Sequence, residues 1–357
     1  MTTKVIQIQN GFQNQKDLES AAKIIRSGGL VVFPTETVYG LGGDATNEKS
    51  AEKIYAAKGR PSDNPLIIHI AKPEDAEPYA ITNETYYRLA KAFMPGPLTV
   101  ILPRKDSIPL RTTGGLDTVA VRCPSNPIAR ELILASGVPI AAPSANLSGK
   151  PSPTCARHVI EDLSGRVDMI LDGGDCQIGL ESTIIRLDGE NATILRPGAV
   201  TADALRCVCE NVAIAPSVAE QLAEGERPLS PGMKYKHYAP NIPFVLLQGS
   251  QHDILSFLKT EQQTKRCAVL CYSEEVSELQ NEKIIDIGKS DHLEIQAQRL
   301  FSALRDADKL DVDIIYGHLP TKDGIGLALY NRMLRAAAHT VLNIENHHTE
   351  ETHGKKK

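Results

Sequence analysis

The chain has 357 residues, of which 41% are hydrophobic and 23% charged, so it is long enough for two domains and has the composition of an ordinary soluble globular protein. Its formal net charge of −5 argues against a protein that holds nucleic acid by bulk electrostatic attraction. The N-terminus lacks a signal-peptide core, no run approaches the roughly 18 apolar residues of a membrane span, and the cysteines form no C-x-x-C pair, which together favour a cytoplasmic protein with reduced thiols.

Helices and short apolar runs alternate along the first half of the chain. An apolar stripe predicts a helix over residues 16–27, which Gly28-Gly29 ends. Further helices are predicted from Ala51 to Lys58, near 83–93 and near 127–136. The predicted strands are 30–33, 66–70, 98–102, 118–124, 139–142, 169–174, 182–187 and 192–198. This order predicts an α/β fold whose sheet mixes parallel and antiparallel strands.

A Pro/Ser/Gly-rich stretch over residues 227–240 indicates a linker, after which a second, smaller α/β unit is predicted. Its strands are 244–247, 268–271, 284–287 and 312–316, and its helices lie near 252–262, 292–308 and 326–342. Gly324-x-Gly326 lacks the spacing of a dinucleotide fingerprint and indicates packing or capping. We therefore predict domains at 1–208 and 242–345, a linker or lid at 209–241, and a disordered tail at 346–357.

The segment from Ala57 to Pro65 precedes an apolar strand and points to anion chemistry. Lys58 and Arg60 are two positions apart on a turn stiffened by Gly and Pro, so they can reach successive oxygens of a polyphosphate. Residues 33–42 form a second polar loop at a strand end. An isolated K-x-R is also typical of a solvated turn, so the motif alone leaves both interpretations open. There is no G-x-x-x-x-G-K-[ST], so any ATP site here is not a P-loop.

Six motifs resemble, in the same order, those of the YrdC-like domain family, and the tether and C-terminal unit resemble its long form, the threonylcarbamoyl-AMP synthases. They are Pro34–Leu41, Lys58–His69, Leu116–Arg122, Ala142–Gly149, Glu181–Thr183 and Leu195–Gly198, with Ser230–Tyr238 in the tether. The resemblance implies a YrdC-like twisted mixed sheet flanked by helices and a smaller Rossmann-like α/β C-terminal domain. It also implies a nucleotidyltransferase that converts L-threonine, bicarbonate and ATP into L-threonylcarbamoyl-AMP and pyrophosphate. This is the first step towards threonylcarbamoyladenosine beside the anticodon of tRNA.

The resemblance also implies the residues of the site. L-Threonine would be bound by Thr35, His69, Arg122, Ser182 and the backbone of Ala142. An Arg fork matches a carboxylate, so Arg122 is the expected clamp on the threonine carboxylate. ATP would be bound by Lys58, Arg60, Asn64, Thr118, Ser144, Ser152, Arg196 and Tyr238, with Lys58 and Arg60 also catalytic. Mg²⁺ is expected through the ATP phosphates, with no side-chain metal ligand.

Each of these residues has a structural alternative when it is taken singly. Thr35 and Ser182 are typical of cap or turn hydroxyls, His69 of a satisfied core histidine and Arg122 of a surface ion pair. No nucleophile constellation is evident, so catalysis is expected to consist of positioning and charge neutralisation. Tyr238 is expected to belong to a lid over the nucleotide. A transient downstream partner, the tRNA threonylcarbamoyl transferase complex, is implied, with no membrane and no obligatory nucleic acid.

Two other functions remain as alternatives. One is an RNA-binding or ribosome-associated module, against which the acidic net charge and the few aromatic residues argue. The other is an enzyme that forms carbamoyl-AMP for hydrogenase maturation, but such proteins also carry C-x-x-C pairs and an acylphosphatase-like unit that this chain lacks.

Overall fold

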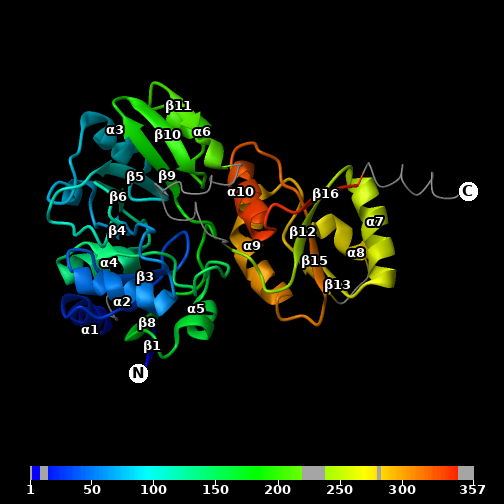
Figure 1. The fold of residues 1–357 in the computed structure, drawn as a ribbon, viewed down its shortest axis with the longest axis horizontal. Coiled ribbons are helices and arrows are strands. Elements are labelled where there is room, and N and C mark those ends of the chain that lie inside the picture. The colour runs from blue at the N-terminus through cyan, green and yellow to red at the C-terminus, as the bar shows by residue number, and fades with distance from the viewer. Residues whose placement is uncertain (1, 9–14, 219–237, 280–282, 345–357) are drawn as a thin grey trace, which may run out of the picture. The chain divides into compact units, whose positions relative to one another are not determined.

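A computed structural model describes residues 2–8, 15–218, 238–279 and 283–344 (Figure 1). The chain divides into two compact units, one of residues 1–148 with 152–235 and one of residues 149–151 with 236–357. Each unit has its own sheet and its own apolar core. Residues 219–237, most of the predicted lid, and residues 346–357, the predicted tail, lie outside the described residues.

The described part of the first unit contains a mixed 11-stranded sheet with the order β1-β8-β2-β3-β7-β4-β6-β5-β9-β10-β11. Strands β4 and β6 are parallel whereas β5 and β6 are antiparallel, which confirms the predicted mixed sheet. The strands are β1 (Lys4–Gln7), β2 (Val31–Phe33), β3 (Gly40–Asp44), β4 (Ile67–His69), β5 (Leu98–Pro103), β6 (Thr118–Arg122), β7 (Ile140–Ala141), β8 (Met169–Asp172), β9 (Thr183–Asp188), β10 (Asn191–Arg196) and β11 (Val212–Ile214).

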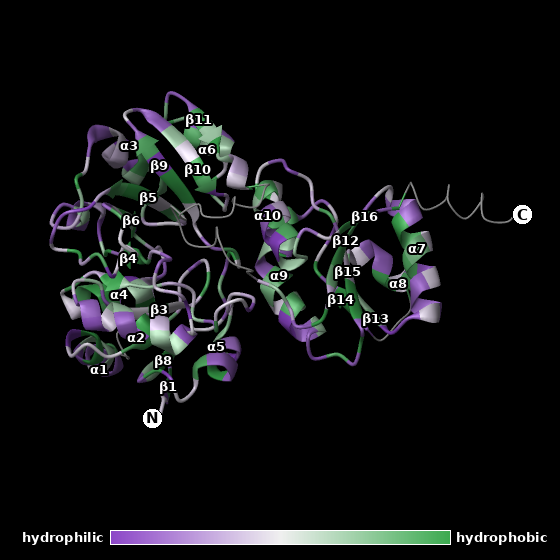
Figure 2. Ribbon diagram, in the orientation of Figure 1, coloured by the Kyte–Doolittle hydropathy of each residue, from purple (hydrophilic) through white to green (hydrophobic). Residues whose placement is uncertain are grey.

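Helices cover the two faces of this sheet unequally. One face packs against α2, α3, α5 and α6, and part of the other packs against α1 and α4. Successive strand residues point to opposite faces, so Val32 joins the first core while Val31 and Phe33 join the second. Figure 2 shows apolar strands between helices that are polar on one side. The helices are α1 (Gln15–Arg26), α2 (Glu48–Lys58), α3 (Glu84–Phe93), α4 (Pro127–Ser136), α5 (Ala156–Leu163) and α6 (Ala202–Arg206).

Beyond α1 and α4, the second face of the sheet carries only a small apolar cluster, and its buried members all come from strands or their immediate ends. These are Ile67, Ile101, Ala120, Ile184 and Leu195. Polar side chains share this part of the sheet with the cluster, because Thr99, Arg122 and His69 alternate with core-facing residues in β5, β6 and β4. This polar half of the face is where the candidate site is built.

Strand β3 begins within the stretch for which the sequence predicted a polar loop. A Cβ added at Gly42 would lie 2.7 Å from the Phe33 ring and 2.8 Å from the Ile140 side chain, so only glycine fits between the neighbouring strands. Glycine is depleted in strands, and therefore β3 had no propensity signal. The loop itself is confined to residues 34–39.

The described part of the second unit is a parallel sheet with helices on both faces. Its strand order is β14-β13-β15-β12-β16, and every pair is parallel, which confirms a smaller α/β domain. Helices α7 and α8 pack on one face and α9 and α10 on the other (Figure 1). The elements are β12 (Phe244–Gln248), α7 (Gln251–Thr264), β13 (Cys267–Cys271), α8 (Val276–Leu279), β14 (Ile284–Asp286), α9 (Leu293–Ala307), β15 (Ile314–His318), α10 (Gly326–Ala336) and β16 (Val341–Asn343).

Two predicted boundaries differ from the structure. The predicted helix 326–342 ends at Ala336, because Ala338 and His339 take positive φ values of 48° and 63° before β16 begins. The sheet of the first unit continues past residue 208, because β11 pairs with β10. Gly326 has a packing role, as predicted: a Cβ there would lie 2.7 Å from the Thr321 carbonyl oxygen.

Candidate active site

The loop between β2 and β3 is a turn organised by the Thr35 hydroxyl. Thr35 Oγ1 donates to the Val38 carbonyl at 2.6 Å and accepts the backbone N–H groups of Thr37 and Val38, each at 3.2 Å. The residue is buried. Thr35 therefore is a turn hydroxyl, the alternative that the sequence left open, and it lies on the loop that delivers Glu36 to the sheet.

Three adjacent strands place His69, Arg122 and Thr99 in one row, which we call the polar row. His69 of β4 pairs with Arg122 of β6, and Arg122 pairs with Thr99 of β5. Directly paired residues of neighbouring strands project from the same face of a sheet, so the three side chains share one surface. All three are buried. The sequence predicted two of the three, and Thr99 was missed although it is a polar residue inside an apolar strand.

Arg122 is held by a carboxylate that the sequence analysis did not nominate. Its Nη2 donates to Glu36 Oε1 at 2.7 Å, and the two side chains are only 5% and 4% exposed. Glu36 Oε2 also accepts the backbone N–H of Ser125 at 3.2 Å. Arg122 Nε is buried and has no hydrogen-bond partner among the described residues. Glu36 thus holds Nη2 of the guanidinium, while Nε is a buried donor without a partner among the described residues and suits a ligand carboxylate.

His69 is a neutral imidazole next to this cation. Burial and then the positive charge of Arg122 lower the pKa of His69 from 6.5 to about 3. Its ring meets Phe33 edge-on, with 6.1 Å between the centroids. Nδ1 is buried and has no hydrogen-bond partner in the part of the chain that the structure describes. His69 is therefore only partly the satisfied core histidine that the sequence offered as an alternative.

Ser182 joins the polar row to Arg196. Ser182 Oγ and Thr99 Oγ1 are 2.7 Å apart. Arg196 at the end of β10 donates from Nε to the Ser182 carbonyl at 3.0 Å and from Nη2 to the Ser182 hydroxyl at 3.1 Å. Ser182, predicted to bind threonine, is thus hydrogen-bonded to Arg196, predicted to bind the nucleotide, and to Thr99, which lies beside Arg122 in the sheet.

Lys58 anchors the loop that follows β7. Its Nζ donates to the carbonyls of Ser144 and Asn146 at 2.5 and 2.6 Å and lies 3.4 Å from Asn146 Oδ1. All three of these oxygen atoms belong to the loop from Ser144 to Asn146. Ser144 Oγ donates in turn to Asn146 Oδ1 at 2.6 Å. The structure thus joins the two motifs that the sequence assigned to phosphate, with Lys58 positioning the Ser144–Asn146 loop.

Arg60 and Asn64 lie on the turn between α2 and β4. Arg60 Nη2 donates to the carbonyls of Asn64 and Pro65 at 3.2 and 3.1 Å. The Asn64 side chain is 0% exposed, and neither its Oδ1 nor its Nδ2 has a hydrogen-bond partner among the described residues. A buried amide with both ends unsatisfied is costly in a folded protein, which is typical of a group kept for a ligand.

Three further predicted residues lie on the same unit. Thr118 is on β6, four positions before Arg122 and so on the same face. The Ala142 N–H donates to the Ile67 carbonyl at 2.9 Å, which fixes that backbone beside β4. Ser152 Oγ donates to Glu181 Oε1 at 2.6 Å. Glu181 belongs to one of the six motifs, but no role was predicted for it.

Tyr238 belongs to the second unit. Its ring stacks on Phe301 with 5.1 Å between the centroids, Arg332 Cζ lies 5.6 Å from its centre, and it has a positive φ of 64°. The side chain is buried within that unit. Its predicted contact with the nucleotide stays a prediction.

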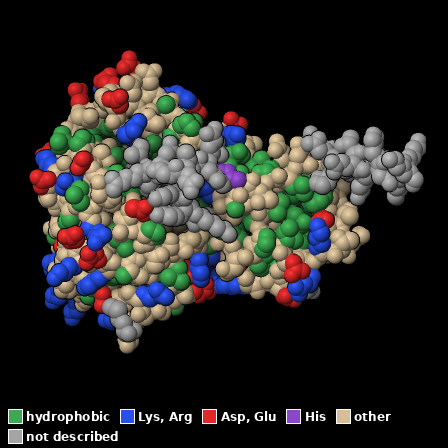
Figure 3. Space-filling model, viewed as in Figure 1, with side chains coloured by type: hydrophobic (Ala, Val, Ile, Leu, Met, Phe, Trp, Pro, Cys, Tyr) green, Lys and Arg blue, Asp and Glu red, His purple; other side chains and the backbone are tan. Residues whose placement is uncertain are grey.

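Other features of the described residues limit the chemistry of the molecule. No group of three or more His, Cys, Asp or Glu side chains there is arranged to hold a metal ion. All seven cysteines are free thiols. None of the helices in the described ranges combines the length and apolar character that crossing a bilayer requires. Figure 3 shows Lys and Arg interspersed with Asp and Glu on the visible face of the first unit, so this face is not a uniformly basic surface.

Comparisons with known proteins point to one family. The family model described as "Telomere recombination" matches residues 23–198, and the one described as "Threonylcarbamoyl-AMP synthase, C-terminal domain" matches residues 200–338. A threonylcarbamoyl-AMP synthase of Bacillus subtilis is 44% identical over 332 residues, which cover 92% of this chain and 95% of the relative. One of Pyrococcus abyssi is 41% identical over 348 residues, which cover 96% and 100%.

A solved structure extends the similarity to the fold of the whole chain. The crystal structure of Pyrococcus abyssi Sua5 complexed with L-threonine matches with a TM-score of 0.87 and 41% sequence identity, and the match covers 96% of this chain and 99% of that chain.

Proposed function

The chain belongs to the threonylcarbamoyl-AMP synthase family, an enzyme family that supplies the first step of threonylcarbamoyladenosine synthesis on tRNA, and from this premise we propose how its residues bind L-threonine and ATP. The observation that carries the proposal is that Arg122, His69 and Asn64 each hold buried polar side-chain atoms that find no partner among the described residues. Unsatisfied buried groups are rare in folded proteins, and a substrate would satisfy them.

L-Threonine binds on the polar row. Its carboxylate accepts a charge-assisted hydrogen bond from Arg122 Nε, the donor that has no partner among the described residues, while Nη2 stays bonded to Glu36. The ammonium or hydroxyl group reaches the neutral His69 Nδ1, and Thr35, Ser182 and the Ala142 backbone complete the polar lining. Glu36 keeps the Arg122 fork in the orientation that this contact needs.

ATP binds beside the threonine, toward the turn after α2. Asn64 supplies the amide that has no partner, Arg60 and Arg196 supply positive charge, and Lys58 holds the loop that presents the Ser144 hydroxyl. Thr118 and Ser152 add polar contacts, and Tyr238 is a further proposed ligand of the nucleotide. Mg²⁺ would be held through the ATP phosphates, with no side-chain ligand, and would supply charge neutralisation there.

The reaction needs no covalent enzyme intermediate. The threonine amine takes up bicarbonate with loss of water, or CO₂ directly, and forms a carbamate. One carbamate oxygen attacks the α-phosphorus, and the bond to the β-phosphate oxygen breaks to release pyrophosphate. The chain contributes positioning and positive charge around the phosphates, for which Lys58 and Arg60 are the proposed catalytic residues. The product passes in the cytoplasm to a transferase complex that modifies tRNA.

Pyrophosphate release from ATP by the full chain tests this proposal. With Mg²⁺ and bicarbonate present, we expect release that depends on L-threonine and stops when bicarbonate is removed. L-Serine, which lacks the threonine methyl group, and L-alanine, which also lacks the hydroxyl, serve as matched substrates and should be progressively poorer. Release that is indifferent to threonine would mean that the polar row serves another acceptor.

A further inference from the structure

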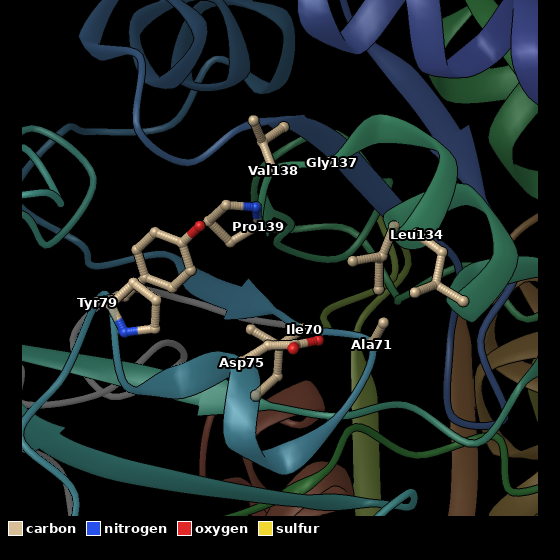
Figure 4. Close-up of a pocket in the computed structure, with 10 residues that line it drawn as sticks. Ile70, Ala71, Asp75, Tyr79, Leu134, Gly137, Val138 and Pro139 are labelled. Atoms are coloured by element: carbon tan, nitrogen blue, oxygen red, sulfur yellow. The ribbon is translucent and has the colours of Figure 1, made fainter.

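A pocket lies in the first unit, apart from the polar row. It is formed where β4 runs on into η2 (Pro73–Ala76), against the end of α4 and the segment before β7 (Figure 4). Its volume is about 250 Å³, and Ile70, Ile133, Leu134 and Val138 supply apolar walls. This is the size of a site for a small molecule rather than for a nucleotide.

The pocket is placed one residue away from the threonine site along β4. Ile70 directly follows His69, and alternate residues point to opposite sides, so the buried Ile70 belongs to the other core from the polar row. Val138 and Pro139 precede Ile140, whose backbone pairs with His69. The pocket and the candidate active site therefore lie on neighbouring residues of the same strands. None of the side chains that line the pocket belongs to the predicted site.

The polar groups of the pocket are negative or neutral. Asp75 lines it, and one oxygen of its carboxylate, Oδ2, accepts the Lys72 N–H at 2.9 Å. Asp75 forms no ion pair with any described residue, and Arg130, which donates from Nε to the Ala71 carbonyl at 3.3 Å, does not reach it as a salt bridge. The half-buried charge of Asp75 is thus uncompensated within the described chain.

Tyr79 forms the wall opposite Leu134 in Figure 4. Its hydroxyl makes no hydrogen bond to any described group. Burial, then the charges of Asp44 and Asp75, raise the pKa of Tyr79. Asp44 is also buried without an ion pair; its Oδ1 accepts from the Thr46 N–H and hydroxyl.

We propose that this pocket binds a small aliphatic amine in its ammonium form, with the charged head at Asp75 and Tyr79 and the hydrocarbon against Ile133, Leu134 and Val138. The Asp75 carboxylate, which has no ion pair with any described residue, would repel an anion, and a neutral ligand would leave its charge uncompensated. An ammonium group supplies that charge and donates to both Asp75 and the Tyr79 oxygen. Leu134, 56% exposed at the rim, is covered by the alkyl chain.

The test is a titration of the ¹⁵N-labelled full chain with n-butylammonium, followed through the backbone amides of Ala71 and Val138. We expect saturable shifts confined to the pocket, with a dissociation constant on the order of millimolar for a ligand of this size. Asp75→Asn keeps the oxygen that accepts from Lys72 but removes the charge, and should weaken binding about tenfold or more. Asp188→Asn, an exposed carboxylate on β9, is the matched control and should bind as the unmodified chain does.

A second ligand and a second variant test the proposal further. 1-Butanol has the same hydrocarbon without the charge, and equal binding of the alcohol and the ammonium would reduce the site to an apolar crevice. Leu134→Lys places a cation at the exposed rim and should abolish binding even if Asp75→Asn folds poorly. No saturable shift, or undiminished binding in Asp75→Asn, would overturn the proposal. Because the readout is binding and not turnover, failure here leaves the proposed function untouched.

Discussion

The two units use arginine–carboxylate pairs in opposite ways. In the first unit, Arg122 and Glu36 form a single contact at 2.7 Å with both side chains about 95% buried, as their exposures of 5% and 4% show. In the second unit, Arg266 forms bonds to Asp311 and Asp313 at distances down to 2.6 Å, but all three side chains are more than half exposed. The exposed cluster has more hydrogen bonds and the shorter distance.

The difference shows that hydrogen-bond number does not decide which pair matters. Exposed ion pairs are screened by water and salt, so each contributes little to stability. A buried pair costs desolvation, and it persists in a protein where each charge is needed. Arg122 adds an unsatisfied Nε to its buried charge, whereas Arg266 offers all its donors to solvent and to two aspartates. This contrast predicts functional importance for Arg122 and none for Arg266.

Replacement of the two arginines by alanine should give the largest contrast. Arg122→Ala removes the proposed carboxylate clamp and leaves Glu36 as an unpaired buried charge, so threonine-dependent pyrophosphate release should fall about 10²-fold or more, equivalent to about 3 kcal/mol. Arg266→Ala should leave the rate unchanged. Both variants are assayed at equal concentration of folded protein. Comparable losses of activity in the two variants would contradict the prediction that Arg122, and not Arg266, is functionally important.

Replacement of Glu36 should lower stability as well as turnover. Glu36→Gln keeps the size of the side chain and a hydrogen-bond acceptor but leaves the Arg122 charge uncompensated, so the free energy of unfolding should drop by about 3 kcal/mol. Urea unfolding followed by far-UV circular dichroism measures it. An unchanged midpoint in Glu36→Gln would mean that water reaches Arg122 and that the pair is not buried in solution.

The pH dependence of unfolding tests the environment of the polar row. The pKa of His69 is lowered to about 3, so between pH 6.5 and 3 the unfolded chain binds a proton there that the native chain does not. Stability must therefore fall as the pH falls through this window. From pH 7 to pH 5 the unmodified chain should lose about 2 kcal/mol more than His69→Gln.

The control for this measurement is His252→Gln on the exposed side of α7, which should keep the slope of the unmodified chain. If His69→Gln also keeps that slope, the native His69 takes up its proton near its ordinary pKa, and the imidazole is not desolvated.

The polar row also shows what the sequence could predict and what it could not. Short apolar runs located β4, β5 and β6, and the resemblance to a known family supplied His69 and Arg122. The pairing of Glu36 with Arg122 joins residues 86 positions apart, and no local pattern reports such a contact. Lys58 was predicted from its charge to meet phosphate, and the structure adds that it donates to the carbonyls of the Ser144–Asn146 loop. That geometry follows from where α2 ends relative to β7, which is set by tertiary packing.

The smallest expected effect is at the exposed cluster, and salt is the variable that separates it from the buried pair. Asp313 accepts from Arg266 Nε and Nη2 at 3.0 and 2.6 Å, but both side chains are in contact with water. Asp313→Asn should therefore shift Tm barely, and any shift should vanish in about 1 M NaCl, where the Debye length is only about 3 Å. The deficit of Glu36→Gln should persist in the same salt, because ions do not enter the core to screen Arg122. If about 1 M NaCl abolished the loss of stability in Glu36→Gln, the Arg122–Glu36 pair would be screened by salt like the exposed Arg266 cluster. The functional distinction between the two arginines would then have no electrostatic basis.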